Sequence, residues 1–158
     1  MSIFKLTNFF LKSYCTFFYI GCIKFAPGTF GTLIAIPLYL IFLNGLPFIT
    51  SFFILIVFTI ISSFIISISY SKKVFDNIDH KSIIIDEILA FLFILLFFNS
   101  NIYQIIFSFL VFRFFDIYKP YPINIIDKNI KNGFGVMLDD LAAAFYCLIV
   151  VDIFYLFK

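Results

Sequence analysis

The sequence predicts an all-α, multihelical integral membrane protein, built of helix hairpins whose polar loops gather on the cytoplasmic face. The first observation is composition: the 158 residues are 63% hydrophobic and only 13% charged, whereas soluble domains carry about a quarter charged residues. The second is charge patterning, because no charged residue occurs over 25–71 or 88–112. The third is that turn-forming residues interrupt both uncharged stretches. The length suits a single membrane-embedded domain over 1–158.

The turns divide these stretches into helices. Asn44 to Pro47 interrupts the first, and Asn99 to Asn101 the second. Only the second predicted helix and the last one reach the roughly 20 residues that a full membrane span needs. The alternative is one continuous span over 88–112, which would place polar residues at the bilayer centre, where they are costly. The predicted helices cover 33–43, 48–70, 88–98, 102–114 and 139–157.

The first 24 residues predict an interfacial amphipathic helix. Lys5 and Lys12 interrupt its apolar residues, which does not fit a cleaved signal peptide. A helix of this pattern lies in the membrane surface with its polar side in water.

Two hairpins would bring the loops 24–32, 71–87 and 115–138 to one face. Because basic residues favour the cytoplasmic side of a membrane, this face is predicted to be cytoplasmic. A net charge of +2 without a basic run gives no indication of a nucleic-acid partner. The basic residues of the three loops and their edges are Lys24, Lys72, Lys73, Lys81, Arg113, Lys119, Lys128 and Lys131.

The first loop holds two Gly-Thr pairs, Gly28-Thr29 and Gly31-Thr32. Glycines allow close approach of the backbone, and free N–H groups at a helix start favour anions such as phosphate. An ordinary capped turn is the alternative.

The other two loops hold most of the acidic residues. Arg113 and Asp116 are three apart, so they share a helix face that Lys119 continues. Gly133 and Gly135 predict a tight turn, after which an acidic pair opens the last helix. Acids without cysteine ligands indicate a hard cation, and magnesium is the usual partner of phosphate. Ion pairs with the lysines and arginine are the structural alternative. The acids are Asp86, Glu87, Asp116, Asp127, Asp139 and Asp140.

Several blocks in order make the chain similar to a known family. They are PGTFGT at 27–32, DHKSIIIDE at 79–87, FRFFDIYKPYP at 112–122, Asp127, and GVMLDD at 135–140. These blocks resemble the phosphatidylglycerophosphatase A family, although Asn132 stands where that family usually has glycine. The resemblance implies an all-helical, magnesium-dependent phosphatase of the bacterial inner membrane. It would convert phosphatidylglycerophosphate into phosphatidylglycerol, with its active site facing the cytoplasm.

The resemblance also implies roles for individual residues. Arg113 and Lys119 would stabilise the phosphoryl oxygens, and His80 could protonate the leaving alkoxide. Direct attack by water and an aspartyl-phosphate intermediate both remain open. Two other classes are a CDP-alcohol phosphotransferase, whose spaced aspartate signature is not found, and a non-catalytic transporter subunit or scaffold. The implied catalytic acids are Asp86, Glu87 and Asp116; the implied Mg²⁺ ligands are Asp86, Glu87, Asp116, Asp127, Asp139 and Asp140; and the implied substrate-binding residues are Gly28, Thr29, Gly31, Thr32 and Lys119.

Overall fold

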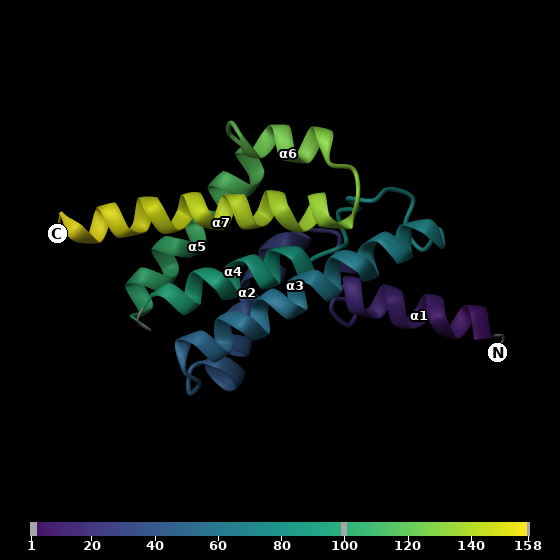
Figure 1. Ribbon diagram of the computed structural model, residues 1–158, viewed down its shortest axis with the longest axis horizontal. Helices are drawn as coiled ribbons and strands as arrows, with labels where there is room; N and C mark the ends of the chain where they lie inside the picture. The colour runs from purple at the N-terminus through teal and green to yellow at the C-terminus, as the bar shows by residue number, and fades with distance from the viewer. Residues whose placement is uncertain (1–2, 99–100, 158) are drawn as a thin grey trace.

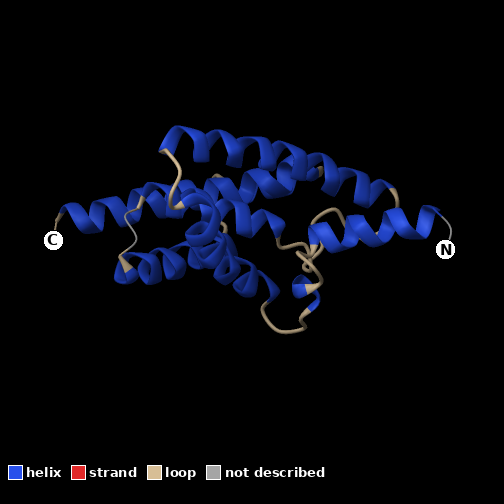
Figure 2. Ribbon diagram, turned by 90° about the horizontal axis from the view of Figure 1, so that it is seen from below, coloured by secondary structure: helices blue, strands red, loops and turns tan. Residues whose placement is uncertain are grey.

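The computed structural model describes residues 3–98 and 101–157, and every regular element in these two ranges is helical (Figure 1; Figure 2). The all-α prediction is therefore confirmed for the described part of the chain. The elements in order are α1 (Ile3–Cys15), a short 3₁₀ turn η1 (Ile20–Cys22), α2 (Pro27–Leu38), a π-helical turn η2 (Tyr39–Leu43), α3 (Phe48–Ser71), α4 (Ile85–Phe97), α5 (Ile102–Tyr118), α6 (Ile123–Asn129) and α7 (Gly133–Leu156).

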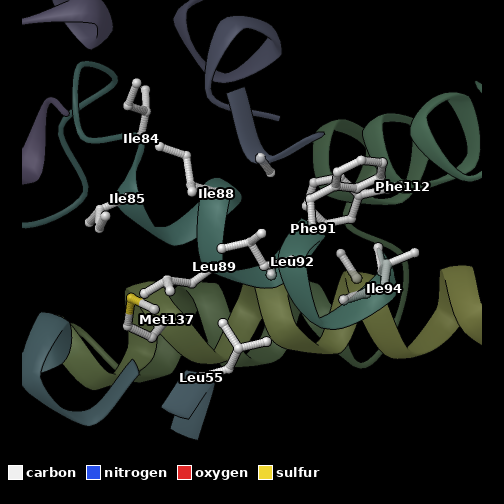
Figure 3. Close-up of a cluster of buried hydrophobic side chains, with 14 of the residues drawn as sticks. Leu55, Ile84, Ile85, Ile88, Leu89, Phe91, Leu92, Ile94, Phe112 and Met137 are labelled. Atoms are coloured by element: carbon white, nitrogen blue, oxygen red, sulfur yellow. The ribbon is translucent and has the colours of Figure 1, made fainter. Parts of the chain in front are cut away.

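Helix α4 forms the centre of the bundle. It packs against α2, α3 and α7, while α5 and α6 lie mainly on α7, and α1 lies on α3. Ile88, Phe91 and Ile94 point in different directions from α4 and are all buried, with Phe112 and Met137 packed around them (Figure 3). A helix that is apolar all round belongs in the interior, which explains the central place of this short segment.

The predicted hairpin arms do not pack along one another. Helix α2 packs against α4 and not along α3. Helix α4 makes only a small contact with α5. Asn99 and Ser100, in the second predicted turn, lie outside the described residues. The three polar loops nevertheless approach one another on the side of the molecule opposite the 44–47 turn (Figure 1).

Helices α3 and α7 are each long and apolar enough to cross a membrane. The prediction of a helix over 48–70 is confirmed to within one residue. The interior side of α3 is formed largely by small hydroxyl residues, whereas large apolar side chains such as Phe53 and Phe64 are exposed. Small residues permit close approach between helices in membranes, and α3 uses them against α7 and α1. The buried hydroxyl residues are Ser51, Thr59, Ser62, Ser63 and Ser69.

Two predicted boundaries near the N-terminus are wrong. The predicted helix over 1–24 ends at Cys15, because Phe17 to Tyr19 adopt left-handed backbone angles. The Cys15 carbonyl then accepts a hydrogen bond from the Ile84 N–H at 3.0 Å, which ties this bend to the start of α4. The predicted loop 24–32 is helical from Pro27, a residue whose fixed φ suits the first helical position.

The predicted loop 115–138 is also wrong in part. Helix α5 continues to Tyr118, α6 lies within the loop, and α7 begins at Gly133 instead of residue 139. Asn132 caps α7, because its Oδ1 accepts a hydrogen bond from the Gly135 N–H at 2.9 Å. Consequently Asp139 and Asp140 lie in the second turn of α7 and do not open it.

Candidate active site

Arg113 of α5 forms one half of the site, which we call the arginine half: Glu87, Arg113 and Asp116. Its Nη1 lies 2.6 Å from Asp116 Oδ2, one helical turn further along α5, and 3.8 Å from Glu87 Oε1 on α4. The predicted sharing of a helix face by Arg113 and Asp116 is thus confirmed. Only 15% of the Arg113 and Glu87 side chains is exposed, so this pair works in a sheltered environment where charge interactions are stronger than in water.

Gly28 allows α2 to approach this ion pair. A Cβ atom added at Gly28 would lie 2.1 Å from Glu87 Oε1 and 3.0 Å from both Arg113 Nη atoms. Gly31, one turn later, meets Ile84 in the same way, with an added Cβ at 3.0 Å from the Ile84 Cβ. The two glycines therefore bring the first turns of α2 against the charged start of α4.

The two threonines of this block differ in position. The Thr32 hydroxyl is fully buried and donates to the Gly28 carbonyl at 2.9 Å, within its own helix. Thr29 is half-buried, and its N–H donates to the Ala26 carbonyl. Substrate binding by this block stays a prediction, with Gly28 nearest to the charged residues.

Three carboxylates meet beside the arginine half. Asp86, Glu87 and Asp140 each offer an oxygen, and these oxygens lie within 4.8 Å of one another. Asp86 and Asp140 are buried, and the Glu87 N–H donates to Asp86 Oδ1 at 3.0 Å. We call this group the acidic triad.

Burial raises the pKa of two of these acids. It raises the pKa of Asp86 to about 6, a rise that the hydrogen bond with Glu87 limits and the charge of Asp79 increases. Burial, with the neighbouring charge of Asp86, also raises the pKa of Glu87 well above its ordinary value. Glu87 Oε2 is buried without a hydrogen-bond partner among the described residues. An oxygen-only group of this kind fits a hard cation.

Lys119 organises the second half, which we call the lysine half: Lys119, Asp127, Lys131 and Asp139. Lys119 ends α5 in a left-handed conformation, with φ of 44°, so it does not continue the Arg113–Asp116 face as predicted. Its Nζ contacts Asp139 Oδ2 very closely and lies 3.3 Å from Asp127 Oδ1. Lys131 reaches Asp127 at 3.8 Å. Burial alone would lower the pKa of Lys119, but the charges of Asp139 and Asp140 and the hydrogen bond to Asp139 raise it overall.

Gly133 and Gly135 do not form the predicted tight turn. Both lie in the first turn of α7, where an added Cβ would lie 2.0 Å from the Ser63 carbonyl oxygen and 1.8 Å from the Ile130 carbonyl oxygen, respectively. The Gly133 N–H also donates to Ser67 Oγ at 3.0 Å. The Gly133 contacts hold the start of α7 against α3, and Asp139 and Asp140 follow one turn later.

His80 lies in the loop before α4, six residues before Asp86 in the sequence, and lines a pocket away from the acidic triad. Its Nδ1 lies 2.7 Å from Ser82 Oγ and 3.2 Å from the Ser82 backbone nitrogen. The ring packs against Phe75 and lines a pocket of about 570 Å³ that no member of the acidic triad lines. Proton donation by His80 stays a prediction.

Asp79 was not among the predicted site residues. It is exposed, and its charge adds to the rise in the pKa of Asp86 that burial causes. The available signal was its place at the start of the DHKSIIIDE block, seven residues before Asp86.

Fold and site together define an all-helical, membrane-associated protein with a buried carboxylate site beside an arginine. The chain belongs to the family described as Phosphatidylglycerophosphatase A, whose sequence model matches residues 13–155.

Individual relatives agree with this membership. A Haemophilus influenzae protein named Phosphatidylglycerophosphatase A is 38% identical over 83% of this chain and 80% of its own length. An Escherichia coli protein of the same name is 32% identical over 78% of this chain and 70% of its own. A Bacteroides thetaiotaomicron relative, 30% identical over 84% of this chain and 86% of its own, has the provisional name phosphatidylinositol-3-phosphatase. No solved structure matches the chain.

Proposed function

We propose that this protein hydrolyses the terminal phosphate ester of phosphatidylglycerophosphate, which yields phosphatidylglycerol and inorganic phosphate in glycerophospholipid synthesis. Family membership supports this activity over a CDP-alcohol phosphotransferase or a non-catalytic scaffold. The observation that carries the proposal is the acidic triad, Asp86, Glu87 and Asp140, placed against Arg113 in a sheltered site.

The cation proposed for the site is Mg²⁺. The donors are all carboxylate oxygens, which Mg²⁺ prefers. Glu87 Oε2, which is buried and has no hydrogen-bond partner in the described part of the chain, provides a free ligand atom. Asp86, Glu87 and Asp140 would hold the ion, with Asp116, Asp127 and Asp139 further out. When bound, Mg²⁺ supplies Lewis-acid polarisation of the phosphoryl group and offsets the repulsion among the acids.

The chain's own residues would hold the phosphoryl group. Asp116 and Glu87 keep the Arg113 guanidinium in one orientation, so that its planar fork can grip phosphoryl oxygens through charge-assisted hydrogen bonds. Lys119, held by Asp139 and Asp127, adds a second positive charge on the other side. Gly28 leaves room for the Glu87 and Arg113 side chains at the start of α2. In the overall hydrolysis, the bond between phosphorus and the lipid oxygen breaks and an oxygen from water takes its place on phosphorus. A proton delivered to the departing alkoxide then gives the lipid alcohol.

The activity test uses the full chain purified in detergent. Phosphate release from phosphatidylglycerophosphate should be rapid with Mg²⁺, cease with EDTA and return when Mg²⁺ is restored. Unchanged release in EDTA would reject the metal, and no release under any condition would reject the phosphatase activity. Phosphatidylinositol 3-phosphate serves as the competing substrate, because of the name of the third relative, and we expect it to be turned over more slowly.

We also propose a multi-pass arrangement in the bacterial inner membrane with the site facing the cytoplasm. The support is the asymmetry of basic residues between the loops and the 44–47 turn, together with the two apolar helices. In a Cys22→Ser background, in which the remaining Cys15 and Cys147 are buried, cysteines are added one at a time. Those at positions 77 and 129 should resist an impermeant thiol reagent in intact cells, and one at position 45 should react. Reaction at 77 or 129 would contradict the arrangement.

A further inference from the structure

An apolar groove lies between α1 and η2, with α3 and α4 forming its floor. It has a volume of about 640 Å³, within the range of about 300–1,000 Å³ typical of small-ligand sites. Its floor consists of buried aliphatic side chains, Leu55 on α3 and Ile88, Leu89 and Leu92 on α4 (Figure 3). The part of the floor formed by α4 runs from Ile85 to Leu92, about 10 Å along the helix axis.

The rim of the groove consists of exposed aromatic side chains. Phe18 from the bend after α1 and Phe42 from η2 are 75% and 65% exposed, and Phe10 and Phe58 are exposed beside them. The open side is therefore apolar as well. In a membrane-associated protein, such a rim lets a hydrocarbon chain enter sideways from the lipid without crossing water.

The groove and the acidic triad meet the first turn of α4 from different sides. Ile85 lines one end of the groove there, and Asp86, the next residue, points to another side of the helix. Ser13 and Tyr14 of α1 line the same end of the groove. The Tyr14 hydroxyl forms a hydrogen bond with Ser62 Oγ at 2.8 Å. The Cys15 carbonyl accepts a hydrogen bond from the Ile84 N–H at 3.0 Å. A backbone hydrogen bond thus ties the end of α1 to the start of α4, at the end of the groove that Ile85 lines.

We propose that this groove binds one acyl chain of the phospholipid substrate while its phosphorylated headgroup occupies the acidic triad and Arg113. This inference rests on the proposed function. A substrate lipid has its chain and its headgroup joined covalently, so binding of the headgroup raises the effective concentration of the chain at the groove. Another lipid of the bilayer would contact the groove with its acyl chain but would have no headgroup bound at the acidic triad. The substrate therefore occupies the groove in preference to other lipids, and the groove confers preference for long-chain substrates.

Filling the groove tests the proposal. Ser13→Phe places a ring in the groove from the surface helix α1, at the end lined by Ile85, and Leu92→Phe places one on the floor at the other end. The matched control is Thr50→Phe, at an exposed position on α3 outside the groove. Rates are compared for dipalmitoyl and dihexanoyl phosphatidylglycerophosphate.

We expect Ser13→Phe to raise KM for the dipalmitoyl substrate by about tenfold, the effect of removing about two methylenes from apolar contact. The kcat/KM for the dihexanoyl substrate should change less than twofold, and Thr50→Phe should change neither. Equal effects on both substrates, or no effect on either, would overturn the proposal.

A second measurement does not depend on turnover or on a folded variant. Wild-type protein is photolabelled with dipalmitoyl phosphatidylcholine that has a diazirine in its acyl chain, and the labelled peptides are mapped. Unlabelled phosphatidylglycerophosphate should remove label from peptides of α1 and α4 that line the groove. Label that persists there at saturating substrate would assign the groove to bulk lipid. Absence of phosphate release from wild type would reject the proposed function instead, and the labelling would still report on the groove.

Discussion

The arginine half and the lysine half of the site are built in different ways. Arg113, Glu87 and Asp116 sit on α4 and α5, Gly28 of α2 lies close against Glu87 and Arg113, and all three side chains are sheltered. The lysine half depends on a left-handed residue and on the short helix α6, and it opens to solvent at Lys131, whose side chain is 58% exposed. Sheltered charges lose more when a partner is removed than exposed ones do. The arginine half, with the acidic triad beside it, should therefore dominate the chemistry.

The largest contrast is expected between two aspartate-to-asparagine changes. Asp140→Asn replaces a carboxylate of the acidic triad with an amide and should lower phosphate release per folded molecule by about a hundredfold or more, as loss of a key electrostatic group does elsewhere. Asp127→Asn, in the lysine half, should lower it by less than about tenfold, because Asp127 lies outside the triad and is partly exposed. Phosphate release at saturating Mg²⁺ measures both. Equal losses in the two variants would remove the distinction between the halves.

Arg113 separates geometry from charge within the arginine half. Arg113→Lys keeps the charge but loses the planar fork, so the rate should fall by roughly tenfold or more, and Arg113→Ala should be worse. Specific activity is measured after the folded fraction is determined by size-exclusion chromatography. If all three proteins were equally active per folded molecule, Arg113 would serve only to pair with Asp116 and Glu87.

The smallest expected effect concerns the glycine contact. Gly28→Ala places a methyl group 2.1 Å from Glu87 Oε1 and should displace that side chain. Small misplacements of catalytic groups are costly, so the rate should fall by about fivefold. Gly45→Ala is the matched control, because an added Cβ there meets nothing within 4 Å. Thermal unfolding of both variants in detergent distinguishes a local displacement from general loss of stability, and a fully active Gly28→Ala protein would refute the role of this contact.

Predictions from local pattern were accurate where one segment decides its own structure. Helix α3 follows an uncharged apolar run that begins after Pro47, and α5 ends before Pro120, which cannot continue it. The Arg113–Asp116 pair follows from helical spacing alone. The predicted start of α7 was wrong, because Gly133 and Gly135 were interpreted as turn residues. Glycine is needed at these positions because the Ser63 and Ile130 carbonyl oxygens lie too close for a side chain.

The sequence by itself determined that this protein is apolar and helical, with acids and bases confined largely to loops and helix ends. It also contained every acid of the site. Only the tertiary structure decided which acids meet. Asp139 and Asp140 are neighbours, but successive residues on a helix point about 100° apart. The rotation of α7 against α3 and α4, set by the contact of Gly133 with Ser63, directs Asp140 to Asp86 and Glu87 and leaves Asp139 to Lys119.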